Sequence, residues 1–272
     1  MYHGENIPGF PAHPHRGFET ITIVEKGVVD HFDSSGSTGR YSNGVVQWMT
    51  AGSGLQHSEM FPLLNEDKEN PLELFQIWLN LPKAKKFCEP DFKMLWSEKI
   101  PILKTESASA KLIAGSFDSS KSLVSTPDSW AANSENNLLI LLISIDKQGS
   151  FAIPKADSNL NRSLYFYKGS SAKIQQETIQ VNHSMDFEFS EDIIIKNGDT
   201  EAKFLFLQSK PISEPVVQYG PFVMNSNEEI EKTFQDFRKT QFGGWSFSTR
   251  EPTSPKESGR FAKYSDGRMD LP

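Results

Sequence analysis

Short runs of β-branched, aromatic and other apolar residues recur along most of this chain, separated by residues that favour turns. The runs in the first half cover residues 19–24, 27–32, 45–49 and 72–79. Those in the second half cover 110–117, 137–146, 162–169, 172–181, 185–190, 192–198 and 202–209. Runs of this length predict antiparallel strands joined by hairpins. The two successive sets predict an all-β fold with two antiparallel barrels or sandwiches in tandem.

One segment, residues 225–240, departs from this pattern and predicts a helix. Ile230, Phe234 and Phe237 follow helical spacing, and Asn225 or Ser226 can cap the start before two glutamates. We therefore expect a short C-terminal helix at about 226–240.

The remainder of the chain, residues 245–272, is polar and rich in prolines and lacks either periodicity. Two interpretations stay open for it. It is a flexible tail, or it is an arm laid across the body and anchored by Trp245, Phe247 and Phe261.

Composition narrows the classes of partner and compartment. The formal net charge of -7 argues against direct nucleic-acid binding, which needs clustered lysines and arginines. The longest apolar run, residues 138–145, falls short of the ~20 residues that span a bilayer, so we expect a core strand and no membrane anchor. One cysteine, Cys88, and the lack of a signal-peptide pattern indicate the cytosol, with the nucleus as an alternative.

The stretch HPHRGFETITIVEKG, residues 13–27, places three ionisable side chains at positions of one parity. In a single strand His13, His15 and Glu19 would share a face, and Ile21 and Ile23 would continue that face inward. An inward pair of imidazoles is costly unless both find partners, and a divalent metal satisfies two neighbouring histidines together. The spacing predicts a chelate, although a His-x-His pair also occurs as a hydrogen-bonded surface pair.

A second pair, His57 and Glu59, follows a glycine-rich turn and also shares one face of a strand. If the two strand ends lie side by side, His13, His15, His57 and Glu59 converge. Three imidazoles and a carboxylate suit iron, manganese, nickel, copper or zinc rather than calcium or magnesium. Such a site leaves positions open for a substrate oxygen or dioxygen.

The other histidines carry a weaker signal. His3 and His31 are expected to be ordinary surface or turn residues. His183 lies in a predicted polar turn without a metal-binding partner nearby, so the second half is expected to be metal-free.

Four stretches together resemble the pirin family of the cupin superfamily: HPHRGFETITIVEKG, STGR with VQWMTAGSGLQHSEM, LELFQIWLNLP, and EPVVQYGPFVMNSNEEI. The resemblance runs in order from about residue 9 to residue 238, and the closing GRFAKYSDGRMDLP is similar to the tail of bacterial-type members. It implies a bicupin of two jelly-roll barrels. We expect a metal-binding barrel at residues 1–104 and a metal-free barrel with the helix and tail at 105–272.

The resemblance also implies one mononuclear divalent transition metal, Fe2+ in most members, held by His13, His15, His57 and Glu59. Glu19 matches the acid that many other cupins use as a ligand. By parity alone both acids could reach the metal, so the preference for Glu59 rests on the resemblance. Pirins carry about a strand pair ahead of the His-x-His segment, whereas Met1 lies twelve residues before His13. Two interpretations stay open: the sequence begins late, or the first barrel lacks the first strands of the family.

Two functions follow from the resemblance. The first is a monomeric dioxygenase that cleaves quercetin-like flavonols with dioxygen, in which Glu59 acts as the catalytic base toward the flavonol 3-hydroxyl. The alternative is an iron-dependent, redox-sensing interaction protein or transcriptional co-regulator that binds a protein partner without turnover. Arg16 would be a surface contact in that reading, or otherwise the partner of a nearby acid.

The wall of the predicted site is the least determined part. Apolar residues there would hold a planar substrate and exclude water. The candidates are Phe18, Trp48, Met49 and Phe75. The alternative role for each of them is a place in the hydrophobic core.

Overall fold

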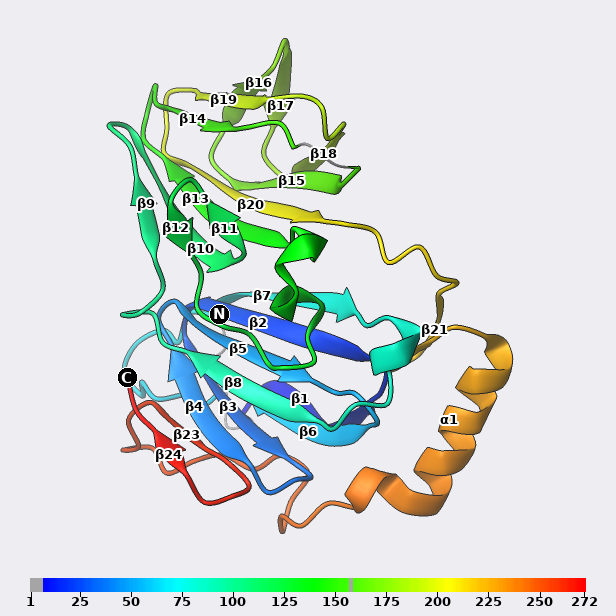
Figure 1. The fold of residues 1–272 in the computed structure, drawn as a ribbon. Helices are drawn as coiled ribbons and strands as arrows, with labels where there is room; N and C mark the ends of the chain where they lie inside the picture. Colours follow the sequence, from blue (N-terminus) through cyan, green and yellow to red (C-terminus); the bar gives the residue numbers. More distant parts are fainter. Residues whose placement is uncertain (1–6, 157–158) are drawn as a thin grey trace. The chain divides into compact units, whose positions relative to one another are not determined.

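The computed structural model describes residues 7–156 and 159–272, so His3 lies outside the described residues. The chain divides into two compact units. The first unit contains residues up to Glu98, together with Thr126–Ser129 and Ser213–Pro272, and the second contains Lys99–Ser125 and Trp130–Ile212. Both units are built from antiparallel sheets, which confirms the predicted all-β fold with two barrels (Figure 1).

The first unit pairs a six-stranded sheet, in the order β1-β6-β3-β4-β23-β24, with a four-stranded sheet, in the order β7-β2-β5-β8. Apolar side chains such as Val29, Tyr41 and Met49 fill the space between the sheets. The element bounds are β1 (Gly9–His15), β2 (Phe18–Lys26), β3 (Val28–Asp33), β4 (Thr38–Ser42), β5 (Val45–Thr50), β6 (Leu55–Met60), β7 (Glu73–Asn80), η1 (Lys83–Lys85), β8 (Asp91–Leu95), β21 (Val217–Tyr219), β22 (Phe222–Met224), α1 (Asn227–Thr240), η4 (Gln241–Gly243), β23 (Phe261–Lys263) and β24 (Met269–Asp270).

The second unit repeats this plan with a six-stranded sheet, β18-β15-β20-β13-β10-β9, and a four-stranded sheet, β14-β19-β16-β17. Its core is apolar, and the run at 138–145 lies in β13, one of the central strands. The element bounds are β9 (Ile102–Lys104), β10 (Ala108–Ala114), β11 (Ser116–Phe117), β12 (Ser120–Lys121), η2 (Trp130–Ala132), η3 (Ser134–Asn136), β13 (Leu139–Ile145), β14 (Ser150–Ile153), β15 (Asn161–Lys168), β16 (Ser171–Ile174), β17 (Glu177–Gln180), β18 (His183–Phe187), β19 (Ile193–Asn197) and β20 (Ala202–Ser209).

The predicted helix forms α1 and is capped as expected. The Ser226 hydroxyl accepts a hydrogen bond from the Glu229 backbone N–H at 3.3 Å. Phe234 packs edge-on against Phe222 of the hairpin β21-β22, with ring centroids 4.9 Å apart. The helix therefore belongs to the first unit, not to the second as the sequence analysis expected, because the hairpin completes its apolar face.

The C-terminal tail is an arm rather than a flexible end. Phe247 packs against Phe32 with ring centroids 5.1 Å apart, and β23 pairs with β4 of the first unit (Figure 1). The arm also reaches β1, where the Ala12 N–H donates to the Arg250 carbonyl at 2.7 Å. The expected assignment of the tail to the second barrel is therefore also wrong.

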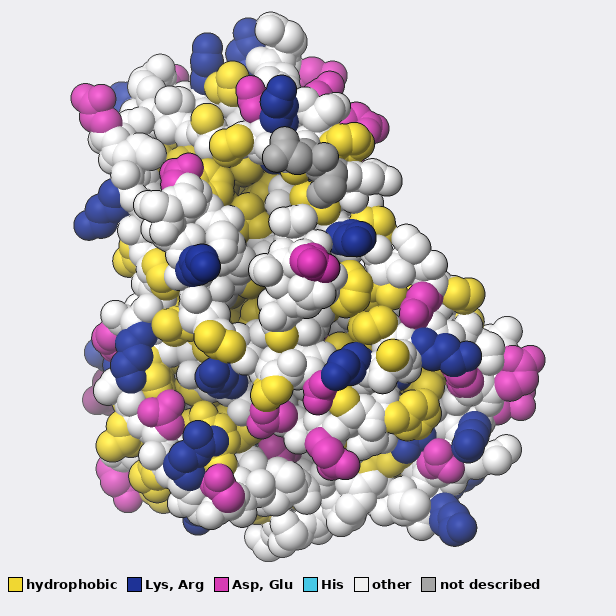
Figure 2. All heavy atoms as spheres, in the orientation of Figure 1, with side chains coloured by type: hydrophobic (Ala, Val, Ile, Leu, Met, Phe, Trp, Pro, Cys, Tyr) yellow, Lys and Arg dark blue, Asp and Glu magenta, His cyan; other side chains and the backbone are white. Residues whose placement is uncertain are grey.

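Charge on the surface is mixed. On the face drawn in Figure 2, lysine and arginine side chains are interspersed with aspartate and glutamate. No helix among the described residues is long and apolar enough to span a membrane.

The segment 13–24 is not one continuous strand. Gly17, with φ +85°, turns the chain between β1 and β2, and these strands belong to different sheets. A Cβ added at Gly17 would lie 2.1 Å from the carbonyl oxygen of Val223 in β22. Glycine is therefore required here for both its conformation and its close approach to the hairpin.

We expect Gly17→Ala to lower the free energy of unfolding by about 3 kcal/mol or more, since backbone strain and a backbone clash add. Gly36→Ala is the matched control. Gly36 has φ +89° but, within the described part of the chain, no atom within 4 Å of an added Cβ, so it should cost only about 1 kcal/mol. Urea unfolding of both variants checks this, and equal losses would show that the clash at Val223 is not real.

Candidate metal centre

Three histidines converge where β1 and β6 pair. His13 lies directly opposite His57 in the antiparallel register, and His15 lies two residues further along β1. Ligand atoms of these three side chains all lie within 4.8 Å of one another. The structure thus brings together three of the four predicted ligands; we call them the histidine cluster.

Backbone carbonyls fix the orientation of two of these rings. The Nδ1 atom of His13 lies 2.8 Å from the Pro11 carbonyl, and that of His15 lies 3.3 Å from the Pro221 carbonyl. A carbonyl only accepts, so Nδ1 carries the proton in both rings and each Nε2 presents a lone pair to the cluster. The two Nε2 atoms are 3.1 Å apart. Two nitrogens bound at ~2.1 Å to one metal at about a right angle would be separated by about 3 Å.

His57 is the strongest argument for a bound ion. Its side chain is fully buried, and neither ring nitrogen has a hydrogen-bond partner among the described residues. Burial, with smaller effects of the neighbouring histidines, holds the pKa of His57 well below its usual value. Burial likewise lowers the pKa of His15 to about 3. The neutral imidazole is the form that binds metals, and a divalent ion would satisfy the otherwise orphaned nitrogen.

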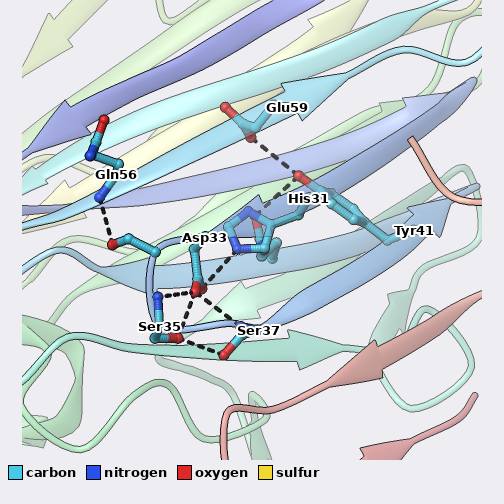
Figure 3. A network of polar contacts seen from close by, with 9 residues as sticks. His31, Asp33, Ser35, Ser37, Tyr41, Gln56 and Glu59 are labelled. Atoms are coloured by element: carbon cyan, nitrogen blue, oxygen red, sulfur yellow. Dashed lines mark hydrogen bonds and ion pairs between the residues drawn. The ribbon is translucent and has the colours of Figure 1, made fainter. Parts of the chain in front are cut away.

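Glu59 lies on the same face of β6 as His57, but its carboxylate is not among the clustered ligand atoms. Its Oε1 accepts from the hydroxyls of Thr22 at 3.0 Å and Tyr41 at 3.2 Å, and its Oε2 accepts from the Gln76 amide at 2.6 Å. Figure 3 shows the Tyr41 hydroxyl directed at this carboxylate. Burial and the neighbouring Glu59 raise the pKa of Tyr41 well above its ordinary value, so Tyr41 remains a donor.

Glu19 is directed away from the histidine cluster. Its Oε1 accepts from the Trp48 indole at 2.9 Å and the Thr50 hydroxyl at 2.8 Å, and its Oε2 accepts from Ser129 at 2.9 Å. The expectation that Glu19 shares a face with His13 and His15 is wrong because the turn at Gly17 moves Glu19 to another sheet. Glu19 is a buried structural carboxylate held by several donors.

His31 is not the surface or turn residue that the sequence analysis expected. It lies on β3 between β4 and β6, is fully buried, and has its Nε2 atom 3.1 Å from the Asp33 carboxylate. Asp33 in turn accepts from Ser35 and Ser37, as Figure 3 shows. The centroid of the His31 ring is 5.6 Å from that of the His57 ring, so the pair of His31 and Asp33 packs beside His57 and helps to hold it in place. In the sequence, the aspartate two residues after His31 is the signal that indicates such a buried pair.

The residues expected in the wall of the metal site do not all lie beside the histidine cluster. Phe18 borders the cluster, with its ring 5.0 Å from that of His15. Trp48 and Met49 are buried, and Met49 belongs to the core. Phe75 is half-buried on β7.

Arg16 is not a surface residue. It is buried and pairs with Asp236 of α1 at 2.9 Å, which is the alternative role considered for it. Gln76 and Trp78 of β7 were not predicted from the sequence, because an edge strand gives no separate signal for residues that face a site.

Comparison with known proteins identifies similar chains. The sequence model of the Pirin family matches residues 1–79, and that of the Pirin C-terminal cupin domain matches residues 140–243. Human pirin is 34% identical over 249 residues, which cover 89% of this chain and 80% of that protein. Pirin-1 of Arabidopsis thaliana is 35% identical over 237 residues, covering 86% and 78%. A crystal structure of quercetin 2,3-dioxygenase from Acinetobacter baumannii matches with a TM-score of 0.78 and 28% identity, covering 89% of this chain and 81% of that one.

Proposed function

We propose that this chain, which belongs to the pirin family, is a metal-dependent dioxygenase that cleaves quercetin-like flavonols. The observation that carries the proposal is the buried His57, whose ring nitrogens have no hydrogen-bond partner in the described part of the chain and lie beside two imidazoles oriented toward the same point. The likeness to a quercetin 2,3-dioxygenase supports the choice of substrate.

His13, His15 and His57 would hold one divalent transition metal, with iron as our proposed ion, and Glu59 is the proposed acidic ligand beside them. Three neutral nitrogens and a carboxylate match the preferences of such ions. When bound, the metal supplies Lewis acidity toward a phenolic oxygen and redox chemistry toward dioxygen.

Glu59 is the group that can take a proton from the substrate. Hydroxyl donors from Thr22 and Tyr41 hold its Oε1 inside the barrel, whereas its Oε2 is held by Gln76, which is half-buried on the edge strand β7. A flavonol 3-hydroxyl would replace the Gln76 amide on Oε2 and pass its proton to that oxygen. Removal of this proton leaves the electron-rich enolate that reacts with dioxygen, and the buried surroundings exclude water.

The test is aerobic incubation of iron-loaded protein with quercetin, with oxygen consumption and loss of the flavonol absorbance followed together. We expect both to proceed at equal molar rates and to stop when a chelator removes the metal. Quercetin left intact by metal-loaded protein would reject the dioxygenase and favour the alternative of a metal-dependent interaction protein without turnover.

A further inference from the structure

Two exposed aromatic side chains border the histidine cluster, one from each sheet. Phe10 of β1 is 48% exposed, and its ring centroid lies 6.4 Å from that of His13. Trp78 of β7 is 39% exposed, and its ring lies 5.5 Å from that of His15. The strands that carry them, β1 and β7, are the terminal strands of their sheets. Single exposed aromatics are common on protein surfaces, but these two both contact imidazoles of one cluster.

The strand registers show that both side chains face the inside of the barrel. Trp78 lies opposite Thr20 and Gln76 lies opposite Thr22, so Trp78 is on the sheet face where Thr22 donates to Glu59. Phe10 lies opposite Glu59 itself. Residues directly opposite in an antiparallel pair share a face. An inward-facing aromatic that is still two-fifths exposed borders an opening, so these two residues mark the mouth of the metal centre.

Trp78 is also held rigidly. Its ring lies on that of the buried Phe18, with centroids 4.4 Å apart and planes tilted by 34°. Its indole N–H lies 3.4 Å from the Gln76 side-chain oxygen. A fixed aromatic face at an opening is a stacking platform for a flat ring system.

We propose that Phe10 and Trp78 form an aromatic clamp that selects planar polyphenols at the mouth of the metal centre; the choice of a flavonol as the ligand rests on the proposed function. The clamp holds the ring system of the ligand while its hydroxyl reaches the histidine cluster and the Glu59 Oε2 atom. The clamp therefore selects ligands that have a planar ring system, and the metal centre selects ligands that have a suitable hydroxyl group.

The test uses zinc-loaded protein under nitrogen, so that binding is measured without turnover. The probes are quercetin and dihydroquercetin, which carries hydroxyls at the same positions but has a saturated bond that breaks the planarity of the ring system and makes its 3-hydroxyl an aliphatic alcohol. Calorimetric titration should give a Kd for quercetin that is at least about tenfold higher in Trp78→Ala than in the unchanged protein. Preference for quercetin over dihydroquercetin should fall in Trp78→Ala and persist in Trp78→Phe, because the part of the preference that comes from the acidity of the 3-hydroxyl is the same in every variant.

Matched variants distinguish the loss of the clamp from a general loss of stability or of an exposed aromatic side chain. Tyr165→Ala removes an aromatic side chain that is 41% exposed in the second unit and should change neither Kd. Phe10→Ala, on the other sheet, should reproduce the loss seen in Trp78→Ala even if the latter lowers stability. Zinc content should be equal in all variants, because none of these side chains is a proposed ligand.

The outcomes separate the clamp from the reaction. An unchanged Kd and an unchanged preference in Trp78→Ala and Phe10→Ala, or no quercetin binding by the unchanged protein, would overturn the clamp. Trp78-dependent binding without cleavage in air would keep the clamp and reject the dioxygenase. Cleavage that is indifferent to Trp78→Ala would keep the dioxygenase and reject the clamp.

Discussion

Glu59→Gln is expected to lower the rate of quercetin cleavage by about 100- to 10,000-fold, the usual contribution of a positioned general base. The amide has nearly the same shape as the carboxylate but cannot accept the substrate proton. Thr22 and Tyr41 can still donate to the amide oxygen, whereas the new amide nitrogen would face the Gln76 amide in place of the acceptor Oε2. The measurement is the steady-state rate per mole of metal-loaded protein.

Glu19→Gln is the matched control for this prediction. Glu19 is equally buried and equally surrounded by donors, but it lies on a different sheet from the cluster and accepts from Trp48 and Thr50. It should alter stability and leave the rate per metal-loaded molecule unchanged. A large loss of rate in Glu19→Gln with little loss in Glu59→Gln would reverse the assignment of the acidic residue.

Arg40→Met is expected to lower the free energy of unfolding by about 3–5 kcal/mol, the cost of removing one partner from a buried ion pair. The Arg40 guanidinium donates to the Asp30 carboxylate at 2.6 and 2.7 Å, and both side chains are buried. It also donates to carbonyls of the C-terminal arm, among them those of Ser254 at 3.0 Å and Pro255 at 2.8 Å. The substitution would remove the Arg40 donor from these carbonyls and the positive charge beside the buried carboxylate, which would still accept from the Ser254 N–H at 2.8 Å.

Arg40→Met should also loosen the C-terminal arm, in addition to lowering the free energy of unfolding. Because Arg40 anchors the arm, limited proteolysis of Arg40→Met should cut between residues 245 and 260 faster than in the unchanged protein. Arg260→Met is the control, since Arg260 is half-buried and its partner Glu98 is exposed, so this pair should contribute less than about 1 kcal/mol. Similar losses of stability in the two variants, measured by urea unfolding, would contradict the role of the buried pair.

Much of the fold follows from local pattern. Strands β2, β3, β5 and β7 start and end within two residues of the predicted runs, because alternation and turn residues are local signals. The run 172–181 predicts one segment but forms two strands, because Gln175 adopts a positive φ of 56° in a tight turn. The association of α1 and the arm with the first unit depends on contacts between segments far apart in sequence, which periodicity does not encode.

The candidate site shows the same division. Two His-containing motifs predicted that His13, His15 and His57 meet, and the structure brings them together. The spacing within each motif is a local feature of the sequence, and the two strands that carry the motifs, β1 and β6, pair with each other. Parity could not exclude Glu19, because the argument assumed an unbroken strand through Gly17. The burial of His31 depends on the strand order of the sheet, which the sequence alone does not give.

The most direct test of a metal centre in this chain is elemental analysis of the purified protein beside its His57→Ala variant, with His183→Ala as a control on the exposed strand β18. We expect about one equivalent of a transition metal in the unchanged protein and in His183→Ala. His57→Ala should retain less than about a tenth of that amount, because the buried ligand is lost. Equal metal in all three proteins, or none in any of them, would contradict the assignment of His13, His15 and His57 as ligands.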